Sequence, residues 1–108
     1  MTKEESSNIP TDYTQVDALM IRLIETVSQY MKKPKDEIHK ILWDTYIFAR
    51  SAHEGQFRKS GEPYILHPVS ACEFLLHLKP DIITIQSCIL HDVIEDTPHD
   101  RTSIAKNF

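Results

Sequence analysis

Residues 81–95 form the most apolar segment of this 108-residue chain, and as a helix they would be apolar on nearly every side. A helix of that kind is expected to be central and buried. Asp81 is a favourable N-cap for it, and Pro98 limits how far it can continue, so we expect a helix that ends near Glu95. Its apolar residues are Ile82, Ile83, Ile85, Cys88, Ile89, Leu90, Val93 and Ile94.

Three earlier segments also place apolar residues at helical spacing, and each ends at a helix breaker. We expect helices over residues 14–31, over residues 35–54, and from His67-Pro68 to the residue before Pro80. A fifth helix is expected to begin near Thr102. No segment shows the alternation of a strand. The chain is therefore expected to be all-α, with about four helices and the start of a fifth.

Local signals give more detail about the helix ends. Thr14, followed three residues later by Asp17, resembles a capping arrangement. Gly55 is placed to end the second helix in a left-handed conformation. His67 is expected just before the first helical position, because proline is favoured there. Residues 1–12 are polar and without period, which predicts a flexible tail before a domain covering residues 13–108.

Charge and composition limit the classes of partner. The net charge is −4, which does not favour direct binding of nucleic acid. A small anionic ligand is compatible with it if a metal and local cations are present. No apolar stretch is long enough to span a bilayer and no signal peptide is evident, so a cytoplasmic protein is expected. Cys72 and Cys88 are expected to be two small buried thiols.

Four residues near the end of the fourth helix predict chemistry: His91, Asp92, Glu95 and Asp96. Helical spacing makes His91 a neighbour of Glu95, and Asp92 a neighbour of both Glu95 and Asp96. Three carboxylates at a helix C-terminus repel one another and oppose the helix dipole. A divalent cation held by imidazole and carboxylate would compensate, and a further carboxylate could orient a water molecule. The alternative is an acidic, solvated helix end.

Two other motifs have a structural and a functional interpretation. His67 could be a helix cap or a core histidine, or it could join His91 and Asp92 in a three-ligand metal set. The basic pair Arg58-Lys59 could be solvated surface, or it could supply cations to a phosphate. His53 is ambiguous, and we favour a structural hydrogen-bonding role for it.

Two stretches together resemble a known family, the N-terminal HD hydrolase domain of RelA/SpoT-type (Rel) stringent-response proteins. The first stretch runs from Ala52 to Pro68 and includes Arg-Lys-Ser-Gly-Glu-Pro-Tyr at positions 58–64. The second is His-Asp-Val-Ile-Glu-Asp-Thr at positions 91–97. The resemblance extends from about residue 18 to the end of the chain. It implies a helical HD-domain bundle, of which this chain is the N-terminal portion.

The resemblance also implies a reaction and a set of roles. The expected enzyme is a Mn²⁺-dependent hydrolase that removes the 3′-pyrophosphate of ppGpp and pppGpp to give GDP or GTP. Glu95 and Asp96 would position and activate water. The other roles carried over are metal ligation by His67, His91 and Asp92, and nucleotide binding by Arg58, Lys59 and Ser60.

One departure from the family pattern lowers the expected activity of these 108 residues. The family has a fourth metal ligand, an aspartate on a later helix, but no acidic residue follows Asp100 here. We therefore expect a partial domain, truncated on its C-terminal side, with weak or no turnover. An incomplete core also predicts a homo-oligomer or a covering partner. Two alternatives to the alarmone hydrolase are a non-catalytic regulatory or interaction module and an HD hydrolase for another nucleotide.

Overall fold

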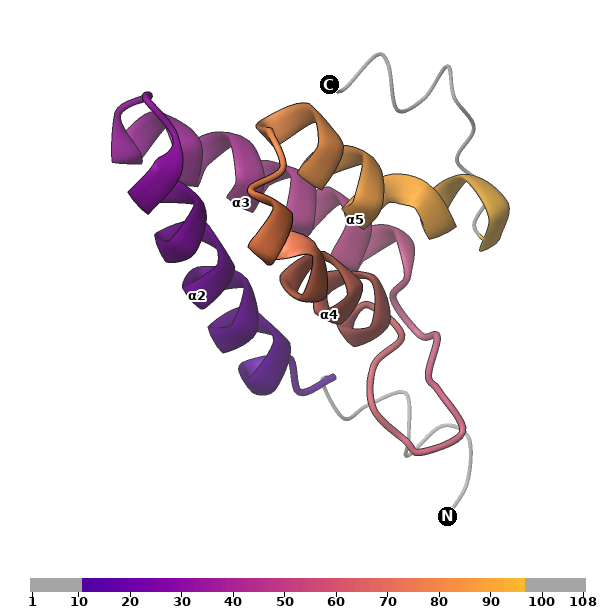
Figure 1. Cartoon of the computed structure of the whole chain (residues 1–108). Coiled ribbons are helices and arrows are strands. Elements are labelled where there is room, and N and C mark those ends of the chain that lie inside the picture. Colours follow the sequence, from indigo (N-terminus) through magenta and orange to yellow (C-terminus); the bar gives the residue numbers. More distant parts are fainter. Residues whose placement is uncertain (1–10, 97–108) are drawn as a thin grey trace.

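The computed structural model describes residues 11–96, with side chains described as far as Val93. These residues form α2 (Thr14–Tyr30), α3 (Lys35–Ala52), α4 (Leu66–Leu75), the short 3-10 helix η1 (Leu76–Leu78) and α5 (Ile82–Asp96) (Figure 1). No strand occurs among them, and the only β-type pairing is an isolated bridge between Phe57 and Pro63. The predicted all-α class is confirmed. The predicted helix near Thr102 and the first ten residues of the predicted tail lie outside the described residues.

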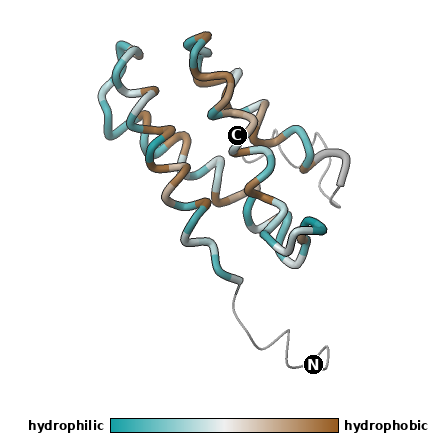
Figure 2. Tube along the Cα trace, turned by 60° about the horizontal axis from the view of Figure 1, so that its bottom comes forward, coloured by the Kyte–Doolittle hydropathy of each residue, from teal (hydrophilic) through white to brown (hydrophobic). Residues whose placement is uncertain are grey.

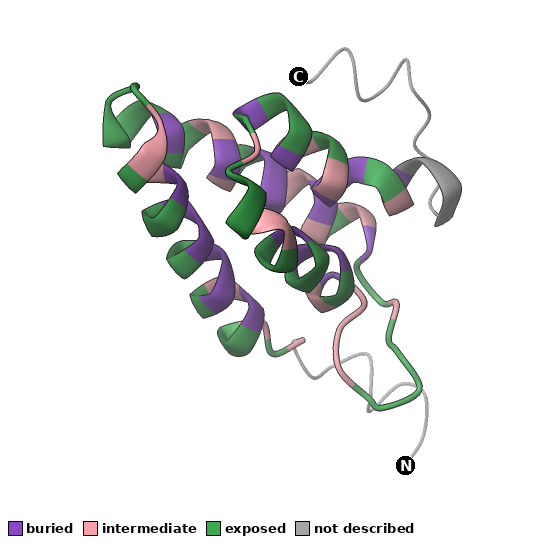
Figure 3. Ribbon diagram, viewed as in Figure 1, coloured by how far each residue is buried: buried purple, intermediate pink, exposed green. Residues whose placement is uncertain are grey.

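The helices pack in a closed cycle around one core. Helix α2 contacts both α3 and α4, and α5 contacts the same two helices. In Figure 3 the buried positions lie on the sides of the helices that face one another, and the exposed positions lie on the outer sides. The connections between the helices are mainly hydrophilic (Figure 2). Between residues 11 and 96, no helix is long and apolar enough to cross a membrane.

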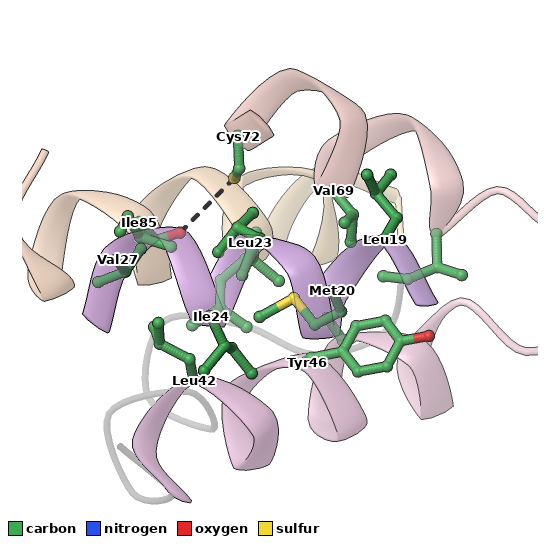
Figure 4. Close-up of a cluster of buried hydrophobic side chains, with 14 of the residues drawn as sticks. Leu19, Met20, Leu23, Ile24, Val27, Leu42, Tyr46, Val69, Cys72 and Ile85 are labelled. Carbon is green, nitrogen blue, oxygen red and sulfur yellow. Dashed lines mark hydrogen bonds between the residues drawn. The ribbon is translucent and has the colours of Figure 1, made fainter. Parts of the chain in front are cut away.

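Helix α2 buries the stripe that its sequence predicts. Figure 4 shows Met20 and Ile24 of α2 beside Leu42 and Tyr46 of α3. The Cys72 thiol of α4 donates a long hydrogen bond of 3.8 Å to the carbonyl oxygen of Ile85 in α5. The buried residues of α2 are Val16, Leu19, Met20, Leu23, Ile24 and Val27.

Helix α5 is less buried than its apolar sequence predicts. Ile82, Ile85, Ile89 and Val93 lie three or four residues apart and are buried, but the side chain of Ile83 is 73% exposed. The expectation of a helix buried all round is wrong for the described residues. Its main helix contacts are with α3 and α4, and two neighbours on one side cannot cover the whole circumference.

Two predicted helix ends are displaced by a few residues. Helix α3 ends at Ala52 rather than at residue 54, and Gly55 takes its predicted positive φ of 84° in the turn that follows. Helix α4 begins at Leu66, so His67 lies inside its first turn rather than before it. Pro68 is tolerated there because the first N–H groups of a helix have no partner within the helix.

Asp17 does not form the predicted capping pair with Thr14. The Thr14 amide donates to Asp12 Oδ1 at 2.9 Å instead. The Asp17 carboxylate accepts hydrogen bonds from the Tyr46 hydroxyl and, at 2.9 Å, from Arg50 Nη1. Burial and the bond to Asp17 raise the pKa of the Tyr46 phenol, so it stays a protonated donor. This network joins α2 to α3, which a local pattern cannot reveal.

We expect Asp17→Asn to lower the free energy of unfolding by about 1–2 kcal/mol, because hydrogen bonds to a partly buried carboxylate are replaced by weaker ones. The matched control is Asp44→Asn. It breaks the ion pair between Lys40 and Asp44, whose side chains are 78% and 54% exposed. The free energy of unfolding should fall by less than about 0.5 kcal/mol. Urea unfolding followed by circular dichroism measures both. Equal losses in the two variants would contradict a special role for Asp17.

Asp81 caps α5 as predicted. Its Oδ1 accepts the Thr84 amide at 2.8 Å, which satisfies one of the free N–H groups in the first turn. The hydrogen bonds from Thr84 lower the pKa of the Asp81 carboxyl. The start of α5 is therefore favoured by the ionised form of this side chain.

The lowered pKa gives a pH dependence with a definite sign. The stabilisation from Asp81 is complete above the pKa of an unfolded aspartate, about 3.9, and is lost as the pH falls through the lower folded value. Asparagine also caps helices but does not titrate, so Asp81→Asn should lose less stability than the unmodified chain between about pH 5 and pH 2.5. Thermal unfolding across this range measures the difference. Parallel stability profiles would show that the Asp81 charge contributes nothing.

Candidate functional site

The loop between α3 and α4 is an ordered turn that presents the basic pair. The Gly61 amide donates to the Arg58 carbonyl at 2.8 Å, and the Arg58 amide donates to the Glu62 carbonyl at 3.0 Å. Gly61 has a φ of 97°, which glycine adopts without strain and which closes a three-residue loop of this kind. Lys59 and Ser60 therefore lie at the exposed tip of the turn.

An open recess of about 510 Å³ lies along this turn. Its lining combines two cations, a hydroxyl and two aromatic rings, a combination suited to phosphate and to a stacked base. The predicted nucleotide-binding residues thus lie together on one surface. The lining residues are Phe57, Arg58, Lys59, Ser60 and Tyr64.

Tyr64 connects this recess to α5. Its hydroxyl donates to Asp92 Oδ2 at 3.1 Å, across 28 positions of sequence. Its ring lies between two histidines, with centroid distances of 4.9 Å to His53 and 5.9 Å to His67. The turn, the start of α4 and the end of α5 therefore meet at one side chain.

His53 lies behind Tyr64 and is buried, with 2% of its surface exposed. Its Nδ1 is 2.9 Å from Gln56 Oε1, and the Tyr64 amide donates to the Gln56 carbonyl at 2.9 Å. Within residues 11–93, His53 Nε2 is buried without a hydrogen-bond partner. The structural hydrogen-bonding role predicted for His53 agrees with this position.

The end of α5 carries the acidic motif in the predicted register. His91 is exposed and Asp92 is half-buried. The helical backbone continues to Asp96, so Glu95 follows His91, and Asp96 follows Asp92, by about one turn. The side chains of Glu95 and Asp96 lie outside the described part of the structure.

The three predicted metal ligands are not gathered into a closed cluster. His67 is exposed in the first turn of α4, and Tyr64 lies between it and Asp92. Among the side chains described, no group of three histidine, cysteine, aspartate or glutamate residues is spaced to bind a metal ion. The structure brings His67 and Asp92 to the same tyrosine without gathering three of the described donors around one point.

The two cysteines lie between α4 and α5, with Cys72 on α4 and Cys88 on α5 one turn before Asp92. Both are free thiols, as predicted, and they lie with Leu75 and Ile85 along an apolar gap that is too narrow to hold a water molecule. Cys72 is buried but Cys88 is only half-buried. The interaction between the two neighbouring thiols lowers the pKa of Cys88 and, together with burial, raises that of Cys72.

Two residues of this region were not predicted as site residues. Tyr64 lies within the quoted motif, but its contact with Asp92 spans two helices and leaves no local signal. The burial of His53 follows only from the way α3 ends. A tyrosine between the basic pair and His67 is the one hint that the sequence offers.

A comparison with protein families matches residues 45–108 to the HD domain, which is more than half of the chain. The chain belongs to the HD domain family. The match includes the whole loop, α4 and the acidic end of α5, which are the parts that form the candidate site. The HD domain is a helical fold, in agreement with the helices described above.

Curated relatives share the same region. The chain is 50% identical over 78 residues to the bifunctional (p)ppGpp synthase/hydrolase SpoT of Escherichia coli K12, covering 70% of this chain and 11% of that protein. It is 41% identical over 86 residues to a guanosine-3′,5′-bis(diphosphate) 3′-pyrophosphohydrolase of Vibrio cholerae, covering 80% and 12%. The predicted resemblance to RelA/SpoT-type proteins is confirmed. The chain spans only about a tenth of the length of these relatives.

Proposed function

We propose that this HD domain acts in hydrolysis of the 3′-pyrophosphate of ppGpp and pppGpp in the bacterial cytosol. The observation that carries the proposal is the hydrogen bond from Tyr64 to Asp92, which joins the basic recess to the acidic end of α5. The names of the relatives, which include a 3′-pyrophosphohydrolase, support the same substrate.

The side chains divide into a binding group and a reacting group. Arg58, Lys59 and Ser60 bind the nucleotide, because their cations and hydroxyl line the recess. Glu95 and Asp96 orient a water molecule and accept its proton as the water oxygen bonds to phosphorus; the bond to the 3′ oxygen breaks, and that oxygen takes up a proton to leave as a hydroxyl. The products are pyrophosphate and GDP or GTP.

We further propose that His67, His91 and Asp92 hold Mn²⁺. Two imidazoles and a carboxylate are suitable donors for a divalent transition metal, so the chemistry of the set fits. When bound, the ion would supply a Lewis acid beside the scissile phosphate. The spacing of the described donors is looser than a metal shell requires, and we therefore propose weak metal binding and weak turnover by the 108 residues alone.

The proposal predicts different effects for two substitutions. His91→Ala should abolish Mn²⁺ binding and turnover, whereas Glu95→Ala should leave Mn²⁺ binding intact and lower turnover by about 100-fold or more. His39→Ala is the control, because His39 stacks on Trp43 at 5.9 Å on α3, outside the Tyr64 region. Calorimetry with Mn²⁺ and release of pyrophosphate from ppGpp measure the two properties. Activity that is unchanged in both site variants would refute the assignment.

The open spacing of the donors also favours a second function for this chain, as a non-catalytic regulatory or interaction module. The two functions differ in a simple measurement. A module of this kind binds no Mn²⁺ in calorimetry and releases no pyrophosphate, and His91→Ala changes neither result.

A groove between α3 and α5 supports the predicted self-association. Its volume is about 780 Å³, and its lining includes Ile41, Trp43 and Ile47 together with Lys40 and Asp44. We propose that a second copy of the chain covers this groove. A two-fold interface would use the same surface on both copies, because such an interface is self-complementary.

Ile83→Lys should weaken this association, because Ile83 is exposed on α5 one turn before Gln86, which lines the groove. Ile21→Lys is the matched control, since Ile21 is an exposed isoleucine on α2. Sedimentation at several concentrations should show dimers in the unmodified chain and in the control, but mainly monomers in Ile83→Lys. A monomer at every concentration for all three proteins would contradict the proposal.

A further inference from the structure

Tyr64 is held in place from three directions. On one side its amide is bonded to the Gln56 carbonyl, and its ring lies against the buried ring of His53 at 4.9 Å. The next residue, Ile65, is buried in the core with 1% of its surface exposed. With the backbone and one ring face fixed, the hydroxyl has a defined position before any ligand binds.

That fixed hydroxyl meets one oxygen of Asp92. The hydrogen bond engages Oδ2, and among the described residues the structure gives Oδ1 no hydrogen bond. Asp92 lies near the end of α5 and is half-buried, where a carboxylate has several rotamers unless a partner selects one. The Tyr64 hydroxyl is a partner of that kind.

We propose that Tyr64 is a positioning residue, which selects the Asp92 rotamer and directs Oδ1 toward a cation, with His53 and Gln56 holding the Tyr64 ring. This inference rests on the proposed role of Asp92 as a metal ligand. Carboxylates that bind metals are commonly oriented by a hydrogen bond of this type, and losing the bond typically lowers metal affinity by about 10- to 100-fold.

Tyr64→Phe is the appropriate variant, because it removes the hydroxyl and retains the ring between His53 and His67. Tyr30→Phe is the matched control. The Tyr30 hydroxyl also joins two elements, since it donates to the Pro80 carbonyl at 2.7 Å, but it has no contact with Asp92. Both variants lose a hydroxyl that bonds one element to another, so a purely structural role would affect them in the same way.

The first measurement needs no metal. Three-bond couplings to the Asp92 carboxyl carbon, measured by NMR in the metal-free chain, report its χ1 rotamer. We expect one dominant rotamer in the unmodified chain and in Tyr30→Phe, and averaging between rotamers in Tyr64→Phe. An averaged Asp92 in the unmodified chain, or one dominant rotamer in Tyr64→Phe, would overturn the positioning role.

The second measurement is calorimetry with Mn²⁺ alone. Tyr64→Phe should bind Mn²⁺ about 10-fold or more weakly than the unmodified chain, and Tyr30→Phe should bind it equally well. Equal affinity in all three proteins would also overturn the positioning role. Absence of Mn²⁺ binding by the unmodified chain contradicts the proposed metal site instead, and the rotamer measurement then decides the role of Tyr64 by itself.

Discussion

The burial of one face of α5 against α3 and α4 is the interaction on which the candidate site depends. Ile82, Ile85, Ile89 and Val93 fix the rotation of the helix about its axis. That rotation determines where the next residues emerge, and it places Asp92 within reach of the loop that leaves α3. The apolar contacts thus set the geometry of the polar ones, because a packed helix cannot rotate without exposing its core face.

Two polar contacts of this domain join elements that are distant in sequence. Asp17 links α2 to α3 through Tyr46 and Arg50, and Tyr64 links the loop to α5. In both cases a tyrosine hydroxyl donates to a carboxylate that is only partly exposed. Apolar contacts depend little on the relative orientation of the groups, whereas hydrogen bonds depend on it strongly. These bonds therefore help to specify how the elements are oriented against the apolar core.

Helical periodicity predicted the four described helices and most of their buried stripes. It also placed His91 and Asp92 correctly on the last turns of α5. It overestimated the burial of Ile83, because an apolar sequence shows that a helix can be covered but not how many neighbours cover it. The capping pattern assigned Asp17 to a local pair with Thr14, although the partners of Asp17 lie 29 and 33 positions away.

The candidate site was predictable in its residue types and less so in its assembly. The basic turn and the acidic helix end are both visible in the sequence, and Arg58, Lys59 and Ser60 line one recess. The hydrogen bond that brings them together depends on the angle between α4 and α5 and on the support of His53. Neither property is encoded in a spacing of residues along one helix.

The rotation of α5 about its axis limits the insertions and deletions that this segment can accept. Successive residues of a helix point about 100° apart, so Ile83, Ser87 and His91 share the exposed face while Ile85 and Ile89 share the buried one. Inserting or deleting a single residue between Ile85 and His91 would turn the acidic motif by that angle relative to the core. The number of residues between the buried isoleucines and the acidic motif can therefore change only by about a whole turn. Any other change would rotate the motif away from its present side of the helix or expose the isoleucines.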